Sequence, residues 1–175
     1  MSKRIKPLPS LEALNAHFIF DAERGELIWR DGPANKYLNK RYIGARAGFV
    51  SEKGYLRVKV CGETHMVHRI IFKMHNKREP VGEVDHENLD SLDNLPGNLR
   101  EATSAQNTWN KSNKRRVRSD LPKGVCFHRR SGRYRARIQK QGRRHELGDY
   151  KSVEDAAKAY AMASNTLHGR FGRVA

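Results

Sequence analysis

The residue types that build hydrophobic cores are scarce in this sequence, and their scarcity limits the size of any fold the chain can adopt. Leu, Ile, Val and Phe supply 36 of the 175 residues, while the formal net charge is +16. A share of these residues near one fifth, combined with a high net charge, is close to the limit below which a chain is intrinsically disordered. No apolar run approaches the ~20 residues that a membrane-spanning helix needs. The sequence therefore predicts small cores and no membrane segment.

The two cysteines, Cys61 and Cys126, lie far apart and form no CxxC pair. This pattern excludes a disulfide framework and argues against zinc, because no Cys and His quartet has the spacing of a zinc finger. No apolar N-terminal segment resembles a signal peptide. We therefore expect a protein of the reducing cytoplasm.

The positive charge is concentrated in the second part of the chain. Residues 111–175 hold 18 Lys and Arg against 5 Asp and Glu, whereas residues 1–110 hold 17 against 14. Such asymmetry predicts two parts, one of which meets a polyanion. Nucleic acid is favoured over an anionic membrane, because the basic residues have the spacing of strands and not of an amphipathic helix.

One segment, residues 81–101, has the opposite charge. It holds six carboxylates, and Arg100 is its only Lys or Arg. Two interpretations remain open. The segment either faces away from nucleic acid, or binds a divalent metal that bridges carboxylate and phosphate.

Apolar periodicity and turn residues predict short elements throughout. In the first part these are a helix from residue 11 capped by Ser10, strands 18–20 and 26–29 around Gly25, strands 55–60 and 64–67, and a helix 68–75. A strand 84–86, a loop, a strand 98–102 and a helix 105–111 then form a ββα unit. After a basic stretch, strands 124–130, 133–140 and 143–147 precede a helix capped by Ser152.

The ββα unit brings candidate catalytic residues together. Asp85 and His86 are neighbours on a strand and so point to opposite faces. The helix of such a unit packs across the hairpin, so Asn107 can face Asp85, and a carboxylate and an amide oxygen can share one hard cation. His86 can act as general base toward water. Asn98 can hold the loop or orient the His86 ring.

Several spaced elements agree in order with a known family. They are Val67, His68 and Arg69; Val84, Asp85 and His86; Asp93 and Asn94; Asn98, Leu99 and Arg100; and Gln106 and Asn107. The pattern resembles the HNH endonucleases of phage and homing type, over residues 10–110 and including the Phe20–Trp29 segment. Leu89 departs from it, since many members have Gly there.

The resemblance implies specific roles. Asp85 and Asn107 would bind a single Mg²⁺ or Mn²⁺ ion, His86 would activate water, and Asn98 would support the loop. His68 and Arg69 also fit the pattern, with Arg69 placed to contact a phosphate. The alternative for this pair is that His68 packs against the hairpin and Arg69 lies on the surface.

The strand 133–139 has one apolar and one basic face. Tyr134, Ala136 and Ile138 share the first face, and Arg133, Arg135, Arg137 and Gln139 share the second. The apolar face can receive the Ala-rich helix, and the basic face can enter the major groove, where Arg pairs with guanine. The alternative is a solvated basic surface, which is weakened by the near absence of acids on this face, where Glu146 is the main exception.

Residues 122–175 resemble an APETALA2-type DNA-binding domain. The motifs that carry the resemblance are Lys123 to Val125, Arg133 to Ile138, Leu147 and Gly148, Glu154 to Tyr160, and Leu167 to Gly169. The expected DNA contacts are Lys123, His128, Arg130, Arg133, Arg135, Arg137, Gln139 and Arg144. Cys126 stands where plant members often have Arg, so the plant target sequence is not carried over.

The sequence thus predicts an α+β protein with an HNH (ββα-metal) nuclease domain at 1–110, a basic linker at 111–121, and an APETALA2-type domain at 122–175. In the second domain a three-stranded antiparallel sheet packs on one helix. We expect a monomeric, site-directed endonuclease that nicks or cuts double-stranded DNA, in a bacterial or phage-infected cell, with neither a small-molecule cofactor nor a membrane partner. The alternative is a non-catalytic DNA-binding regulator with a degenerate HNH fold. An RNA-binding accessory protein is disfavoured, because the basic face lacks stacking aromatics.

Overall fold

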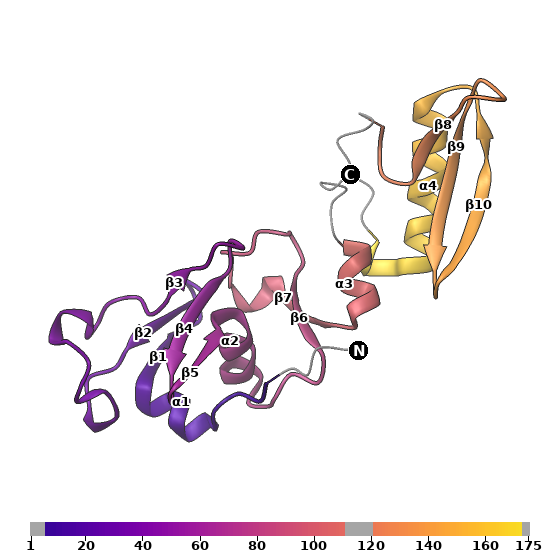
Figure 1. Cartoon of the computed structure of the whole chain (residues 1–175). Helices are drawn as coiled ribbons and strands as arrows, with labels where there is room; N and C mark the ends of the chain where they lie inside the picture. The colour runs from indigo at the N-terminus through magenta and orange to yellow at the C-terminus, as the bar shows by residue number, and fades with distance from the viewer. Residues whose placement is uncertain (1–5, 111–120, 173–175) are drawn as a thin grey trace. The chain divides into compact units, whose positions relative to one another are not determined.

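The computed structural model describes residues 6–110 and 121–172. Contacts divide the chain into two compact units, Met1–Ala102 and Thr103–Ala175, whose helices and strands are labelled in Figure 1. Each unit has its own hydrophobic cluster. Both units combine antiparallel strands with helices, so the predicted α+β class is confirmed. The predicted linker lies almost wholly outside the described residues, and the predicted domain limits of 110 and 122 stay predictions.

The first unit consists of short elements around one core. They are α1 (Leu11–His17), β1 (Phe18–Asp21), β2 (Glu26–Trp29), β3 (Phe49–Val50), β4 (Leu56–Val60), β5 (Glu63–Met66), α2 (Val67–Asn76), β6 (Glu83–His86) and β7 (Leu99–Ala102). The predicted cap of α1 is confirmed, since Ser10 Oγ accepts a hydrogen bond from the Ala13 amide at 3.1 Å.

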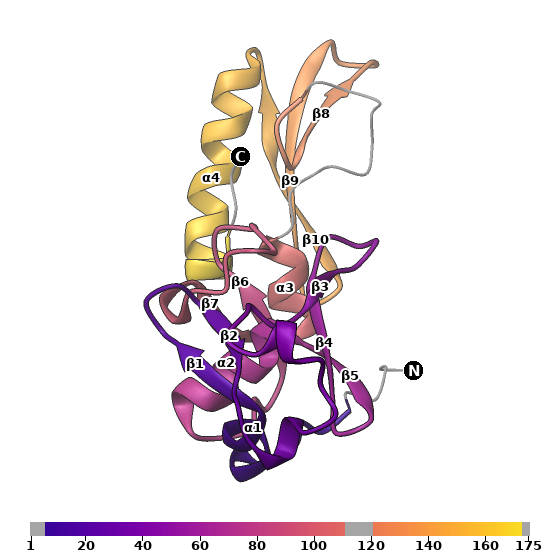
Figure 2. The ribbon, with the colours of Figure 1, turned by 90° about the vertical axis from the view of Figure 1, so that its left-hand side faces the viewer.

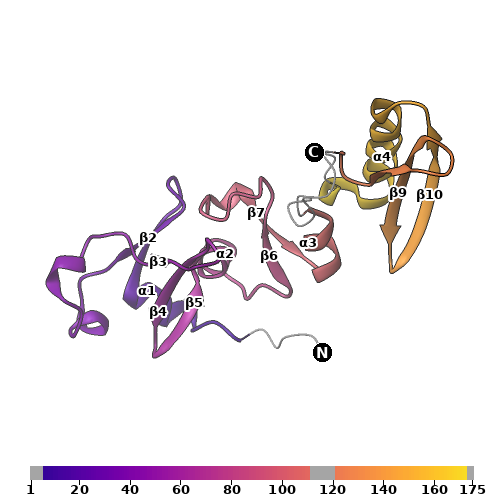
Figure 3. The same cartoon turned by 45° about the horizontal axis from the view of Figure 1, so that its top comes forward.

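The core of this unit follows from the periodicity of β4 and α2. Leu56, Val58 and Val60 alternate into the core, and α2 buries Ile70 and Ile71 completely. Burying each such side chain stabilises the fold by about 1.5–3 kcal/mol. Figure 3 shows α2 between the β4–β5 strands and the β6–β7 hairpin, and α2 contacts both. Helix α2 therefore packs against the β6–β7 hairpin, which belongs to the acidic segment 81–101.

The β6–β7 hairpin sets the register of the acidic segment. The strands pair antiparallel, with Asp85 opposite Arg100 and His86 opposite Leu99. The loop between them contains Leu89 at φ 68°, a left-handed conformation that favours glycine. The departure at Leu89 thus falls where the backbone calls for Gly.

Helix α3 (Ser104–Asn110) follows β7 in sequence and is grouped by its contacts with the second unit.

The second unit contains a three-stranded antiparallel sheet on a helix, as predicted, and also α3, which was expected to complete the ββα unit of the first domain. β8 (Val125–His128), β9 (Arg133–Lys140) and β10 (Arg143–Tyr150) lie in the order β10-β9-β8, and α4 (Val153–His168) covers one face (Figure 2). Ser152 Oγ accepts from the Asp155 amide at 3.1 Å, which caps α4 as expected.

Small residues let α4 lie close to the sheet. Ala156 and Ser164 are fully buried on its inner face. Gly124 has φ +77°, and a Cβ there would overlap the ring of Tyr160 and lie 2.8 Å from the Arg137 carbonyl oxygen.

No helix within residues 6–110 and 121–172 has the length and apolar character to cross a bilayer.

Candidate functional site

The carboxylate of Asp85 is buried and ion-paired across the hairpin. Asp85 is 6% exposed and Arg100 is 5% exposed. Arg100 Nε and Nη2 both donate to Asp85 Oδ2 at 3.2 Å, and Arg100 Nη1 lies 3.4 Å from Glu87 Oε1. The pairing compensates a charge that would be costly to bury alone. Sequence reasoning gave Arg100 no role, although its being the one Lys or Arg in an acidic segment was a signal.

His86 lies beside Asp85 and is held by a different partner. The ring is 5% exposed, and its Nε2 lies 3.0 Å from Oδ1 of Asn94, which is also buried. Asn94 was recognised as part of the pattern, but its contact with His86 was missed. The two nitrogens of an imidazole differ in role, and the partner of one decides what the other can do.

Two further rings surround His86. The centroid of the His68 ring lies 4.9 Å away in an edge-on arrangement, and the Tyr55 ring lies 5.8 Å from His68 and 6.1 Å from His86. Burial, with smaller contributions from His86 and Arg69, lowers the pKa of His68 to about 3. His68 is therefore neutral near pH 7 and packs beside His86 against the hairpin. Sequence reasoning missed Tyr55, which no local spacing connects to His86.

Asn98 orders the loop between the strands. Its Oδ1 accepts from the Asn88 amide at 3.0 Å, and its Nδ2 donates to Asn88 Oδ1 at 3.0 Å and to the Asp93 carbonyl oxygen at 2.8 Å. These contacts run from one end of the loop to the other. The geometry agrees with loop support, the first of the two roles expected for Asn98.

Arg69 is directed to the segment that precedes β6. Its Nη1 donates to the Gly82 carbonyl oxygen at 3.1 Å, and its Nη2 lies 3.6 Å from Glu79 Oε1. Burial lowers the pKa of the Arg69 guanidinium, an effect opposed by Glu79. The contacts tie α2 to β6, and the expected phosphate contact stays a prediction.

Asn107 lies in the first turns of α3. A reciprocal pair caps this helix, because Thr103 Oγ1 accepts from the Gln106 amide at 3.2 Å and Gln106 Oε1 accepts from the Thr103 amide at 2.8 Å. The Asn107 amide donates to the Thr103 carbonyl oxygen at 2.9 Å. Since α3 is grouped with the second unit, the pairing of Asn107 with Asp85 stays a prediction.

The donor types at these positions are those that suit a hard divalent cation. Asp85 offers a carboxylate and Asn107 an amide oxygen, both of which Mg²⁺ accepts. Among the residues that the structure describes, no three His, Cys, Asp or Glu side chains cluster as a metal site.

Part of the chain is similar in sequence to known proteins. Residues 65–108, which contain His68, Asp85, His86 and Asn107, match the family model described as HNH endonuclease. This segment is similar to that family. A protein of Acanthamoeba polyphaga mimivirus, "Uncharacterized HNH endonuclease L560", is 36% identical over 88 residues, which is 50% of this chain and 44% of that protein. The chain thus spans less than half the length of this relative.

A solved structure, "DNA binding and cleavage by the HNH homing endonuclease I-HmuI", aligns over 94% of this chain and 91% of that one. The sequence identity is 18% and the TM-score is 0.43.

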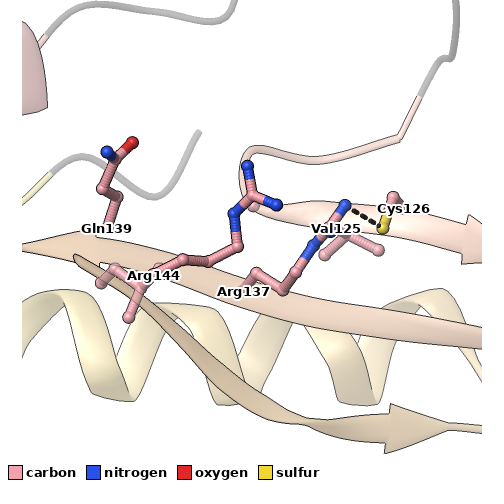
Figure 4. Close-up of a pocket in the computed structure, with 7 residues that line it drawn as sticks. Val125, Cys126, Arg137, Gln139 and Arg144 are labelled. Carbon is pink, nitrogen blue, oxygen red and sulfur yellow. Dashed lines mark hydrogen bonds between the residues drawn. The ribbon is translucent and has the colours of Figure 1, made fainter. Parts of the chain in front are cut away.

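In the second unit, the faces of β9 alternate as predicted. Ala136 and Ile138 are buried against α4, which leaves the arginines on the opposite face. Arg137, Gln139 and Arg144 line a shallow pocket with Val125 and other residues of β8 and β9 (Figure 4). Within it, Arg137 Nη2 lies 2.9 Å from Cys126 Sγ. The structure thus brings three of the predicted DNA contacts into one patch.

The prediction that Glu146 is the main acid on this face is wrong. Asp149 shares the face and accepts from Arg135 Nε and Nη2 at 2.6 and 2.8 Å, with Glu146 at 3.5 Å. This pairing raises the pKa of Arg135 and lowers the pKa of Asp149. The cause is a β-bulge between Glu146 and Gly148, which puts Asp149 opposite Arg135 and on the same side as Glu146.

The other predicted DNA contacts differ in their surroundings. Lys123 Nζ donates to the Trp109 carbonyl oxygen at 2.5 Å, and His128 Nδ1 lies 2.8 Å from Ser131 Oγ. Arg130 and Arg133 are exposed at the ends of the β8–β9 turn. Their contacts with DNA stay predictions.

Proposed function

We propose that the chain is a site-directed DNA endonuclease whose HNH segment hydrolyses a phosphodiester bond. One observation carries the proposal. Asp85 and His86 are adjacent and buried on one strand, and each is held by its own partner, Arg100 and Asn94. Buried groups need partners in any case, but neighbours on a strand point to opposite faces, so Asp85 and His86 are also held apart, as a reaction that uses one carboxylate and one base requires.

In this proposal His86 accepts a proton from water while the water oxygen attacks phosphorus. The bond from phosphorus to the leaving oxygen breaks, and that oxygen takes up a proton from a solvent water. Asp85 and Asn107 would hold one Mg²⁺ or Mn²⁺ ion, which when bound polarises the phosphate and stabilises the leaving oxygen. Asn98 keeps the loop ordered around the base.

His68 and Arg69 have supporting roles in this account. The pKa of His68, lowered to about 3 by burial, makes this ring a neutral neighbour that restrains His86. Arg69 fixes the start of β6 through the Gly82 carbonyl oxygen, and we propose that it also faces a phosphate next to the cut.

The second unit would position the cut on double-stranded DNA. We propose that it is a DNA-binding domain of the APETALA2 type, whose sheet presents Arg133, Arg137 and Arg144 to the major groove and its phosphates. Arg135 is already neutralised by Asp149, so it would contribute less to phosphate binding. A role in homing would fit a nuclease joined to such a domain.

A second candidate function is a non-catalytic DNA-binding regulator. The observation that favours it is the engagement of Asp85 Oδ2 by two nitrogens of Arg100, which would compete with a cation. In this candidate the second unit still binds specific DNA sequences, and His86 has no role as a general base.

A plasmid assay separates the two candidates. Purified protein is mixed with supercoiled plasmid in Mg²⁺ or Mn²⁺, with and without EDTA, and DNA binding is followed in parallel by gel shift. The endonuclease converts the plasmid to relaxed circles or linear DNA, and EDTA stops the conversion. Binding without conversion in either metal would support the regulator.

A further inference from the structure

The amide of Asn94 has a defined orientation at His86. Its Nδ2 donates to the Leu92 carbonyl oxygen at 3.3 Å, and its Oδ1 lies 3.0 Å from His86 Nε2. The side chain is 2% exposed. An amide that gives its nitrogen to a carbonyl presents its oxygen on the other side, and an oxygen can only accept. His86 Nε2 therefore carries the hydrogen.

This assignment fixes the chemistry of the second ring nitrogen. A neutral imidazole has one N–H, so a hydrogen on Nε2 leaves Nδ1 as an acceptor. A half-turn of the ring about its Cβ–Cγ bond would put a carbon where Nε2 faces Asn94, so the hydrogen bond also selects the ring orientation. The adjacent rings of His68 and Tyr55 restrain the same motion.

The backbone of Asn94 packs against a turn that is distant in sequence. Gly25, between β1 and β2, has φ +64°, and a Cβ there would lie 2.5 Å from the Leu95 nitrogen and 2.6 Å from the Asn94 carbonyl carbon. Both the dihedral angle and the contact require glycine. The β1–β2 hairpin, which belongs to the family pattern without an assigned role, thus packs directly against the residue that touches His86.

We propose that Asn94 is a positioning residue that holds His86 with its hydrogen on Nε2, so that Nδ1 is the nitrogen that takes the proton from water, and that the Gly25 turn sets the backbone presenting Asn94. The consequence for catalysis rests on the proposed function. The state of the ring itself does not depend on it, and so can be measured separately.

The first measurement is NMR of the full chain labelled with ¹⁵N at histidine, at a mildly alkaline pH where imidazoles are neutral. Subtraction of the His86→Ala spectrum assigns the His86 signals. We expect a hydrogen on Nε2 in the wild type, seen as a slowly exchanging N–H proton. Asn94→Leu, which keeps the approximate volume and removes the acceptor, loses this proton signal, while Asn94→Asp keeps it.

Asn88→Ala is the matched control, because it disturbs the same loop without touching His86. We expect it to keep the N–H signal. Gly25→Ala should weaken the signal as Asn94→Leu does, because it displaces the Asn94 backbone. If Asn94→Leu fails to fold, Gly25→Ala and Asn94→Asp still test the contact. A wild-type hydrogen on Nδ1, or an N–H signal unchanged in Asn94→Leu, would overturn the proposal.

The second measurement is single-turnover cleavage. Asn94→Leu should lower the cleavage rate by about 100-fold, with little change in the protein concentration that gives half-saturation, because misorienting a catalytic group costs rate and not binding. Asn94→Asp should recover most of the rate. A wild-type chain that does not cut DNA would remove the catalytic consequence and the proposed function together, and the NMR result would still decide the ring state.

Discussion

The β6–β7 hairpin and the β8–β10 sheet are both antiparallel and both rich in charged residues, yet these side chains differ in how far they are buried and paired. In the hairpin, Asp85, Arg100 and His86 are buried, and each is fixed by named partners. On the sheet, Arg133 and Arg144 are exposed, and only Arg135 is in a tight carboxylate pair among the described residues. Chemistry at one phosphorus needs few groups held in place, whereas binding along a phosphate backbone needs many cations that act additively.

The comparison predicts that single substitutions matter most in the hairpin. Asp85→Ala should reduce cleavage by about 10³-fold, since it removes the proposed metal ligand. It also leaves Arg100 buried without its main partner, which should lower the free energy of unfolding by about 3–5 kcal/mol. Cleavage rates and urea unfolding measure both effects.

Glu87→Gln is the control for Asp85→Ala. Glu87 also pairs with Arg100, at 3.4 Å, but its side chain is 52% exposed. A pair of this kind contributes about 0–1 kcal/mol, so the variant should cut DNA almost normally. Equal losses in both variants would mean that the acidic charge of the segment, and not the position of Asp85, is what matters.

On the sheet, effects should be smaller and should depend on which arginine is changed. Arg137→Ala should weaken binding to the preferred DNA site by about 1–3 kcal/mol. Arg135→Ala should weaken it less, because Asp149 already neutralises that guanidinium. Gel shifts across a salt series measure this, since the slope of log affinity against log salt falls by about 0.9 for each phosphate that a variant no longer neutralises. A larger loss of DNA affinity in Arg135→Ala than in Arg137→Ala would contradict the view that the arginine paired with Asp149 contributes less to binding.

The buried histidine of the first unit should make its stability depend on pH. The pKa of His68 is lowered from 6.5 to about 3, so the unfolded chain binds a proton in this range that the folded chain does not. This contribution is fully present above pH 6.5 and is lost as the pH falls toward 3, by up to about 1.4 kcal/mol per pH unit. Urea unfolding of wild type and His68→Gln across this range measures it. Identical pH slopes would contradict the burial of a neutral His68.

Local pattern was enough to predict most elements of the fold. Period-two alternation placed Val58 and Ile138 in their cores, and Ser10 and Ser152 were recognised as caps because a cap is a local interaction. The order of β6, loop and β7 also followed from sequence. The approach of the Gly25 turn to Asn94 could not be predicted, because it joins segments about seventy residues apart through backbone packing alone.

The candidate site shows the same limit. Asp85 and His86 were singled out by their place in the predicted ββα unit and by the resemblance to HNH endonucleases. Their partners were not, because Arg100 lies across the strand pair, Asn94 lies in the loop and Tyr55 lies beside a different sheet. Asp149 was missed for another reason. The predicted strand ended at residue 147, whereas β10 continues to Tyr150. In a regular strand the spacing of three would also put Asp149 on the face opposite Glu146, and the bulge between Glu146 and Gly148 reverses that.

The most direct test of the proposed endonuclease compares His86→Ala with His75→Ala, an exposed histidine of α2 in the same unit. Both proteins are assayed for plasmid cleavage in Mg²⁺ and for DNA binding by gel shift. We predict that His86→Ala loses cleavage by about 10²–10⁴-fold, the contribution of a general base, and binds DNA as the wild type does, while His75→Ala does both normally. Metal-dependent cleavage by His86→Ala at the wild-type rate would contradict the assignment of His86 as the base.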